Sequence, residues 1–180
     1  MTSGQEPTGP DIDPNALAEL LDKQAIYEVV MRYCRGIDRL DFDLVRDAYH
    51  PDGVDHHTGF DGNVEEFIDW VRPKLEGLGG TMHTLGNHLV ELHGDRAISE
   101  CYFAATHWGH PDFGDFTSGS RYVDLMERRE GRWAIAERWA VREWTRSDEG
   151  RMIAPEAAGP RGHRDRTDPL VELQSRLTAR

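Results

Sequence analysis

The first half of the chain spaces its apolar residues as helices do, and the second half alternates them as strands do. Over residues 15–40, apolar side chains recur three or four positions apart, which predicts one long helix with a broad buried face. The stripe contains Leu17, Leu20, Leu21, Tyr27, Met31 and Cys34, with Ile26, Val30 and Ile37 beside it. Asp41 suits the N-cap of a short second helix over residues 42–49. Residues 63–78 predict a third helix, which Pro73 bends or divides.

The second half predicts two long hairpins. Their turns fall at Gly94-Asp95 and at Glu130-Gly131, because such dipeptides favour tight two-residue connections. The strands that these turns join cover residues 83–92 and 96–108, and then residues 118–129 and 132–144. A short strand is also expected over residues 53–60. Helices followed by a long antiparallel sheet place the chain in the α+β fold class.

Composition divides the chain into three parts. Residues 1–14 read as a disordered tail, residues 15–145 as one folded domain, and residues 146–180 as a C-terminal extension rich in Arg, Asp, Gly and Pro. Within the extension, only residues 168–177 have a helical pattern. The N-terminus has no apolar secretory core, and no apolar run approaches the roughly 20 residues of a membrane span. We therefore expect a cytoplasmic protein.

Net charge narrows the range of partners. The 180 residues carry a formal charge of −12, which disfavours nucleic acid and membrane surfaces because both attract a basic face. A small neutral ligand remains compatible with this charge. The two cysteines, Cys34 and Cys101, lie far apart in apolar segments and are expected to be buried free thiols.

Asp38 is the first residue whose position suggests chemistry. It continues the helical stripe through Tyr27, Met31 and Cys34 at spacings of four, three and four, so its carboxylate is expected to face the core. A buried carboxylate needs a partner. It also lies near a helix C-terminus, where the helix dipole makes a carboxylate a better proton acceptor. A half-exposed residue with no role in chemistry is the alternative.

His83 begins the first long strand, and its orientation depends on register. A two-residue turn at Gly94-Asp95 puts His107 on the core face and His83 on the solvent face. A β-bulge near Gly86-Asn87 would reverse the start of the strand and bring His83 inside. Taken alone, a strand histidine is more often structural than catalytic.

The last hairpin is apolar on both faces. One face is expected to carry Tyr122, Met126, Trp133, Ile135, Trp139 and Val141. The other holds small residues around Arg138, which suits either a cavity for an anionic or carbonyl oxygen or an ion pair with an acidic neighbour. The bulky face needs cover, and we expect Trp133 and Trp139 to be buried against another subunit.

The nine histidines raise the question of a metal site. His56 and His57 are adjacent, and His107 and His110 are three apart near a strand end. Neighbouring strand residues point to opposite faces, so neither pair has good chelate spacing. The sequence also lacks the H-E-x-x-H, P-loop, dinucleotide and serine-elbow motifs. We expect no metal ligands and no cofactor.

Three segments carry a family resemblance. They are "YCRGIDRLDFDLVRDAYHPDG", "TMHTLGNHLVEL" and "YVDLMERREGRWAIAERW", within a similarity from about Leu17 to Trp144. The chain resembles the SnoaL-like branch of the nuclear transport factor 2-like superfamily. This resemblance implies a cone-shaped, strongly curved antiparallel sheet wrapped around N-terminal helices, a cystatin-like α+β barrel with an apolar pocket. Fold alone does not imply function.

The same resemblance assigns roles to individual residues. Asp38 and His83 match an Asp-His dyad of this branch, and His107 matches a second histidine of its scytalone dehydratases. Arg138 matches a pocket arginine and Tyr33 a variable pocket position, whereas Ile37 stands where scytalone dehydratases have tyrosine. The residues expected to contact substrate are Asn87, Tyr102, Phe103, Trp108 and Tyr122.

The implied activity is a cofactor-free lyase of the dehydratase type. Asp38 would orient the His83 imidazole, which would take a proton from a bulky, mostly apolar carbonyl or aromatic small molecule. Tyr33, His107 or Arg138 would stabilise the developing charge or protonate the leaving group. Alternatives are an isomerase, a cyclase or a retro-aldol lyase using the same dyad, a structural β subunit of a ring-hydroxylating dioxygenase, and a binding module. The related dehydratases imply a homotrimer.

Overall fold

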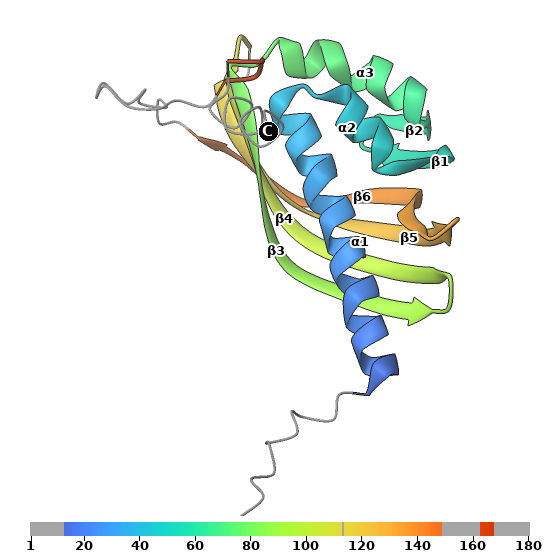
Figure 1. Ribbon diagram of the computed structural model, residues 1–180. Helices are drawn as coiled ribbons and strands as arrows, with labels where there is room; N and C mark the ends of the chain where they lie inside the picture. Colours follow the sequence, from blue (N-terminus) through green and yellow to red (C-terminus); the bar gives the residue numbers. More distant parts are fainter. Residues whose placement is uncertain (1–12, 113, 149–162, 168–180) are drawn as a thin grey trace, which may run out of the picture.

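The computed structural model describes residues 13–112, 114–148 and 163–167. Three helices pack against one curved sheet of six strands (Figure 1). The helices are α1 (Pro14–Arg39), α2 (Phe42–Asp47) and α3 (Val64–Glu76). The strands are β1 (Tyr49–His57), β2 (Phe60–Asn63), β3 (Gly80–His93), β4 (Arg96–His110), β5 (Gly114–Arg129) and β6 (Arg132–Asp148). The predicted α+β class is confirmed.

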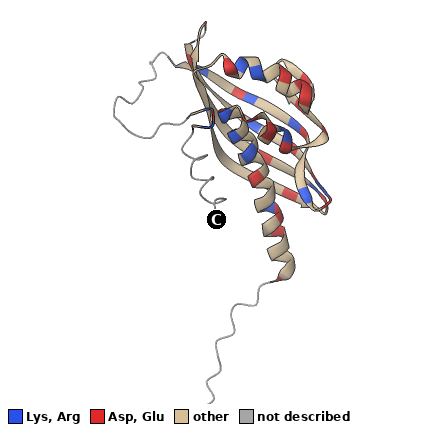
Figure 2. Ribbon diagram, turned by 45° about the horizontal axis from the view of Figure 1, so that its top comes forward, with Lys and Arg blue, Asp and Glu red and all other residues tan. Residues whose placement is uncertain are grey.

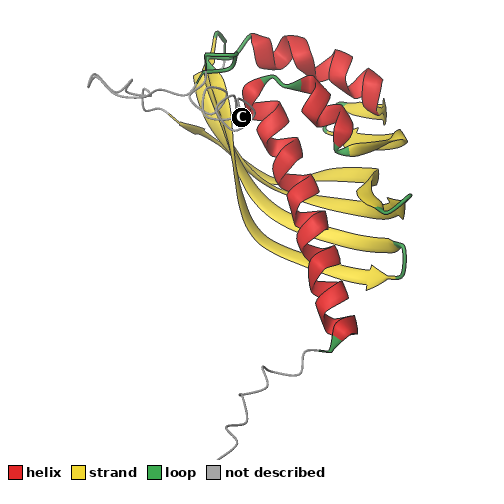
Figure 3. Ribbon diagram, viewed as in Figure 1, coloured by secondary structure: helices red, strands yellow, loops and turns green. Residues whose placement is uncertain are grey.

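The sheet order is β2-β1-β6-β5-β4-β3. Every neighbouring pair is antiparallel except β1 and β6, which run parallel, so the sheet is mixed where the sequence predicted an antiparallel one. β2 and β3 are its two edges, so among the described strands the sheet curves strongly without closing into a barrel. Figure 3 shows the long strands bending around the helices, which lie on the concave side. A space for a ligand can form there, between sheet and helices.

Local capping fixes where the helices begin. The Asp41 carboxylate accepts a hydrogen bond from the Leu44 backbone N–H at 3.1 Å, which confirms the predicted cap of α2. Asn63 and Glu66 form a reciprocal capping box at the start of α3. α3 continues through Pro73 for one more turn, so Pro73 does not divide it.

The buried face of α1 differs from the predicted stripe. Its first turns extend beyond the sheet (Figure 1), so the leucines there meet no partner surface, and Leu20 is 64% exposed. Exposure also extends to Leu17, Leu21 and Met31. The buried side chains of α1 are Ile26, Val29, Val30, Tyr33, Cys34 and Ile37. The helical period was therefore correct, but the orientation of the helix was not.

A bulge in β6 changes the faces of the last hairpin. Leu125 pairs with Glu137 and Met126 with Ile135, which leaves Ala136 as the extra residue. The bulge separates Trp133 and Trp139, which the alternation placed on one face. Trp133 is 4% exposed.

Trp133 is buried by residues of its own chain. Its indole N–H donates to the Asp22 carboxylate of α1 at 2.8 Å, which corrects the expectation of a covering subunit. Trp139 is 50% exposed and stacks on His56. Its outward position is compatible with assembly, and the homotrimer stays a prediction.

The ends of the chain fall largely outside the described residues. The predicted tail up to residue 12 and the helix candidate at 168–177 are not part of the description. Of the extension, residues 163–167 are described, and the Arg164 guanidinium donates to the carbonyl oxygens of Leu75, in the last turn of α3, and of Leu78, just after that helix. None of the described helices has the length and hydrophobicity needed to cross a bilayer. Acidic and basic residues are interspersed along helices and strands (Figure 2).

Candidate active site

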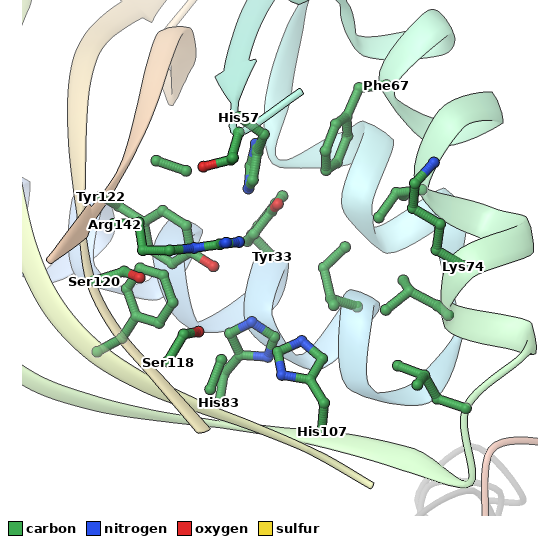
Figure 4. A pocket seen from close by; sticks show the side chains of 18 of the residues that line it. Tyr33, His57, Phe67, Lys74, His83, His107, Ser118, Ser120, Tyr122 and Arg142 are labelled. Atoms are coloured by element: carbon green, nitrogen blue, oxygen red, sulfur yellow. The ribbon is translucent and has the colours of Figure 1, made fainter. Parts of the chain in front are cut away.

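A cavity of about 430 Å³ lies between the concave face of the sheet and the helices α1 and α3 (Figure 4). Its wall is mostly apolar, which is typical of a site for a small organic molecule. The apolar part of this wall includes Ile37, Phe67, Val71, Leu75, Leu78 and Phe116. Polar side chains are interspersed in this wall, among them Tyr33, His57, Lys74, His83, His107, Ser118, Ser120 and Arg142 (Figure 4).

Asp38 lies in the last turn of α1 and anchors the start of β3. Its carboxylate accepts three hydrogen bonds: from the Thr81 hydroxyl at 2.9 Å, from the His83 backbone N–H at 2.9 Å, and from His83 Nδ1 at 2.7 Å. Its side chain is only 12% exposed. The expectation that this carboxylate faces the interior and finds a partner is confirmed.

The bulge in β3 turns His83 toward Asp38. Leu85 pairs with Phe103 and His88 with Cys101, so Gly86 and Asn87 together face a single residue of β4. This is the bulge that the sequence predicted, and it reverses the faces of the first residues of β3. The His83 side chain is 7% exposed and lines the cavity.

The hydrogen bond to Asp38 also selects the tautomer of His83. Because the carboxylate accepts at Nδ1, that nitrogen carries the proton and Nε2 keeps its lone pair. Within the part of the chain that the structure describes, Nε2 has no hydrogen-bond partner. A neutral imidazole held in this way can accept a proton from a molecule in the cavity.

Two opposing effects act on the Asp38 carboxyl. Burial acts to raise its pKa, because a charge is less stable away from water. The hydrogen bonds and charge of His83, with the Thr81 hydroxyl, outweigh burial, so the pKa lies below its ordinary value. Asp38 is therefore ionised at neutral pH and can stabilise a protonated His83.

His107 lies beside His83, with ring centroids 6.3 Å apart, and stacks on Phe116 at 4.4 Å. Burial, together with the neighbouring His83, lowers the pKa of His107 to about 4. The ring is thus neutral at neutral pH. Its Nδ1 is buried without a hydrogen-bond partner among the described residues.

Tyr33 forms part of the cavity wall and packs edge-on against Tyr122, with ring centroids 5.5 Å apart. Burial, reinforced by the Asp55 carboxylate and opposed by Arg138, raises the pKa of Tyr33 well above its ordinary value. The phenol therefore keeps its proton and acts as a hydrogen-bond donor.

Arg138 does not line the cavity. Its guanidinium is fully buried and bonds the Asp124 carboxylate twice, at 2.8 and 2.7 Å, while its face rests on the rings of Tyr33 and Tyr122. The bulge at Ala136 shifts the register by one place and sets Arg138 opposite Asp124. The sequence allowed two interpretations of Arg138, and the structure shows the ion pair. The expectation that Arg138 lines the cavity was wrong.

A different arginine reaches the cavity. Arg142, further along β6, lines the space, and its guanidinium extends toward Tyr33 and Tyr122 (Figure 4). It forms no ion pair with any described residue. Sequence reasoning missed it because Arg138 and Arg142 share one strand face, and only packing decides which of them the tyrosine rings cover.

The predicted substrate contacts divide according to strand face. Phe103 and Tyr122 line the cavity and stack with ring centroids 3.9 Å apart. Tyr102 follows in alternation and is 44% exposed on the other face, and Asn87 is exposed in the bulge. Trp108, next to the inward His107, packs on Gly80 so closely that a Cβ at that position would come within 2.2 Å of the indole. Asn87, Tyr102 and Trp108 are therefore not part of the cavity wall.

A second aspartate-histidine pair was not predicted. Asp55 and His57 are two residues apart on β1, so both side chains face the same side, and the Asp55 carboxylate bonds His57 Nδ1. The other Asp55 oxygen accepts from the Tyr49 hydroxyl at 2.5 Å. His57 lines the cavity. The D-x-H spacing on a strand was the signal in the sequence that could have identified this pair.

The remaining candidate groups among the described residues are metal ligands and cysteine thiols. Over residues 13–112, 114–148 and 163–167, no group of three or more His, Cys, Asp or Glu side chains is placed to hold a metal ion. Cys34 and Cys101 are buried free thiols, as predicted. Burial raises the pKa of Cys101 to about 11, so its thiol stays protonated at neutral pH.

Comparison with known proteins supports the fold and the family resemblance. A family profile described as a SnoaL-like domain matches residues 18–139. An uncharacterised protein of Mycobacterium tuberculosis is 30% identical over 87 residues, which cover 47% of this chain and 59% of that protein. The chain thus spans 59% of the length of the curated relatives it matches.

Two solved structures have the same fold. A hexachlorocyclohexane dehydrochlorinase from Novosphingobium barchaimii matches with a TM-score of 0.71 at 16% identity, over 78% of this chain and 99% of that one. A candidate scytalone dehydratase from Novosphingobium aromaticivorans matches with a TM-score of 0.68 at 16% identity, over 80% and 99%. At such low identity, the similarity establishes the fold alone.

Proposed function

The chain belongs to the SnoaL-like domain family, and on that premise we propose that it is a lyase of the dehydratase type that works without a cofactor. One observation carries the proposal: the Asp38 carboxylate holds His83 Nδ1 at 2.7 Å, with the ring at the wall of a largely apolar cavity. A fixed imidazole with one free nitrogen is the arrangement that general-base catalysis requires.

In the proposed reaction, His83 Nε2 removes a proton from a carbon next to a carbonyl group. The carbonyl oxygen gains negative charge, and His83 becomes an imidazolium beside the ionised Asp38. This ion pair is stabilised because it forms away from water, where opposite charges attract more strongly. Loss of a hydroxyl group from the next carbon then completes a carbon–carbon double bond.

The developing negative charge needs donors. Tyr33 keeps its proton and lines the cavity, and Arg142 extends a cationic guanidinium into the same space. We assign to these two residues the stabilisation of the enolate oxygen, in place of Arg138, whose charge is used by Asp124. Neutral His107 offers a further polar contact to substrate.

The cavity also suggests a class of substrate. Its volume of about 430 Å³ accommodates a molecule of two or three fused or linked rings, and its aromatic wall suits aryl or polyketide-like groups. Phe103 and Tyr122 present stacked rings to such a ligand. We propose a bulky, mostly apolar β-hydroxy ketone as the substrate type.

The first test isolates proton abstraction. Dihydrochalcone, an apolar ketone without a leaving group, is incubated in deuterium oxide, and proton NMR follows deuterium entry next to its carbonyl. Wild-type protein should accelerate the exchange, and His83→Gln should lower this rate by about 10²–10⁴. His56→Gln is the matched control, because His56 stacks on exposed Trp139 and pairs with Asp61.

The second test separates dehydration from the alternatives. An isomerase, a cyclase or a retro-aldol lyase would share the exchange reaction, whereas conversion of β-hydroxydihydrochalcone to the strongly absorbing chalcone requires loss of water. A non-catalytic subunit or binding module would do neither. Wild-type protein that exchanges no ketone from a set of aryl and fused-ring compounds would contradict the proposed function.

A further inference from the structure

Dehydration requires an acid as well as a base. When the hydroxyl group leaves, it must receive a proton, because hydroxide is a poor leaving group in an apolar cavity. The imidazolium of His83 lies on the side from which it took the proton, so it cannot reach a hydroxyl group that leaves from the opposite face of the substrate. Another group at the cavity wall must therefore provide it.

The Asp55–His57 pair lies where such a group is needed. Figure 4 shows His57 entering the cavity from the side opposite to His83 and His107. Its ring stacks on Phe67, with centroids 4.9 Å apart, and this contact together with the Asp55 bond fixes its direction. No described residue bonds His57 Nε2, and the His57 side chain is 22% exposed. This nitrogen can thus meet a bound molecule.

The carboxylate behind His57 is unusually well enclosed. Asp55 is 0% exposed, and its two oxygens bond His57 and the Tyr49 hydroxyl. Burying a carboxylate is costly unless a cation or several donors offset it. The Asp55 carboxylate therefore depends on the two donors that it has, and His57 Nδ1–H is one of them. A merely structural histidine could bond the same carboxylate, but it would not need to present its second nitrogen to a cavity.

We propose that His57, held by Asp55, is the general acid that protonates the leaving hydroxyl group. This inference rests on the proposed dehydratase function. His83 Nε2 takes the proton from carbon, the freed electron pair forms the carbon–carbon double bond, and the carbon–oxygen bond breaks. The departing oxygen takes the proton of His57 Nε2 and leaves as water. Proton exchange with solvent then returns both histidines to their starting states.

The placement of the two histidines has a stereochemical consequence. A base and an acid on opposite walls act on opposite faces of a substrate held between them. The proton and the hydroxyl group should therefore leave from opposite sides, in an anti elimination. β-Hydroxydihydrochalcone with deuterium at one of its two methylene positions tests this outcome. In an anti elimination, one diastereomer of this probe gives chalcone that keeps the deuterium, and the other gives chalcone that has lost it.

The main test varies the leaving group. β-Hydroxydihydrochalcone and its acetate ester give the same chalcone, but acetate leaves without needing a proton. His57→Gln should lower the dehydration rate by about 10²–10⁴ and leave acetate elimination within about tenfold of wild type. His83→Gln should lower both rates. Retained acetate elimination also shows that the His57→Gln protein is folded.

Asp55→Asn tests whether Asp55 acts through His57, which it holds in position. A purely structural defect would slow both eliminations equally, whereas loss of the charge behind His57 should slow dehydration selectively. His56→Gln, which removes the neighbouring histidine of the same strand, should change neither rate.

The outcomes separate the two proposals. Equal losses for both leaving groups in His57→Gln, or unchanged dehydration, would overturn the acid assignment while wild-type turnover still supports the lyase. Wild-type protein that neither exchanges nor eliminates any ketone probe would overturn both. A selective loss of dehydration supports both.

Discussion

The two aspartate-histidine pairs of this cavity are built in different ways. Asp38 and His83 are 45 positions apart and meet because α1 packs against β3. Asp55 and His57 are two positions apart and meet because strand alternation points both to one side. The Asp38 carboxylate has three donors and a slightly exposed side chain, whereas Asp55 is fully enclosed and shares its charge with Tyr49.

This difference has a chemical meaning. A carboxylate with several donors depends less on a cation beside it, and Asp38 holds His83 in one orientation by its Nδ1. An enclosed carboxylate with fewer donors depends more on a cationic partner, which suits an acid. The same two residue types can therefore have opposite roles, decided by what surrounds each carboxylate.

The largest effect is expected from a change in the Asp38–His83 pair, which serves proton abstraction. Asp38→Asn should lower deuterium exchange of dihydrochalcone by about 10²–10⁴, because His83 loses the charge that stabilises its protonated form. Asp38→Asn combined with His83→Gln should be little worse than either change alone, since the two residues act as a unit. The exchange rate by NMR is the measurement.

The matching change in the other pair is the control for this result. Asp55→Asn should leave the exchange rate of dihydrochalcone nearly unchanged, because exchange has no leaving group. If Asp55→Asn slowed exchange as strongly as Asp38→Asn does, the two pairs would not have the separate roles assigned to them.

The Arg138–Asp124 ion pair lies outside the cavity, and breaking it should lower the free energy of unfolding. Arg138→Met leaves Asp124 buried without a cation, and this should cost about 3–5 kcal/mol in the free energy of unfolding. Replacing both residues, as Arg138→Met with Asp124→Leu, should restore most of the loss. Urea unfolding followed by tryptophan fluorescence measures both values, and an unchanged stability in Arg138→Met would contradict the structural role.

A smaller effect is expected from His107 and depends on pH. Its pKa of about 4 in the folded protein lies below the ordinary value of about 6.5. Between these values the unfolded chain binds a proton that the folded protein does not, so stability falls as pH decreases from about 6.5 to about 4. At most, this one group contributes about 1.4 kcal/mol per pH unit.

Removing the titrating ring should flatten this dependence. His107→Phe keeps a ring against Phe116 and should lose stability less steeply over the same pH interval. The free energy of unfolding, measured at several pH values for both proteins, checks the slope. Parallel curves for wild type and His107→Phe would show that His107 is not the group responsible.

Much of the fold followed from pattern because it depends on local chemistry. Asp41 caps α2 through its own side chain, and the hairpin turns at Gly94 and Gly131 rest on positive φ angles of 63° and 79°. The bulge at Gly86 was predictable because the regular register of the Gly94-Asp95 hairpin would have left His83 on the solvent face. In these cases, the information lies within a few residues or within one hairpin.

The candidate site was only partly predictable. Asp38, His83, His107, Tyr33, Phe103 and Tyr122 were expected at the cavity and line it or contact a residue that does. Arg138 was misplaced because the bulge at Ala136 sets it opposite Asp124, where the ion pair holds it under the tyrosine rings. Arg142 was missed because it shares the strand face of Arg138, and alternation alone does not distinguish the two.

The sequence by itself determined the type and order of most elements, because periodicity and turn residues act over short distances. The one short strand expected over residues 53–60 is instead the strand pair β1 and β2. It also placed Asp55 and His57 on one face of one strand. Only the tertiary structure decided which face of α1 is buried, that β1 runs parallel to β6, and that Arg142 rather than Arg138 reaches the cavity. Those outcomes depend on how distant segments pack, and packing couples residues that no local pattern connects.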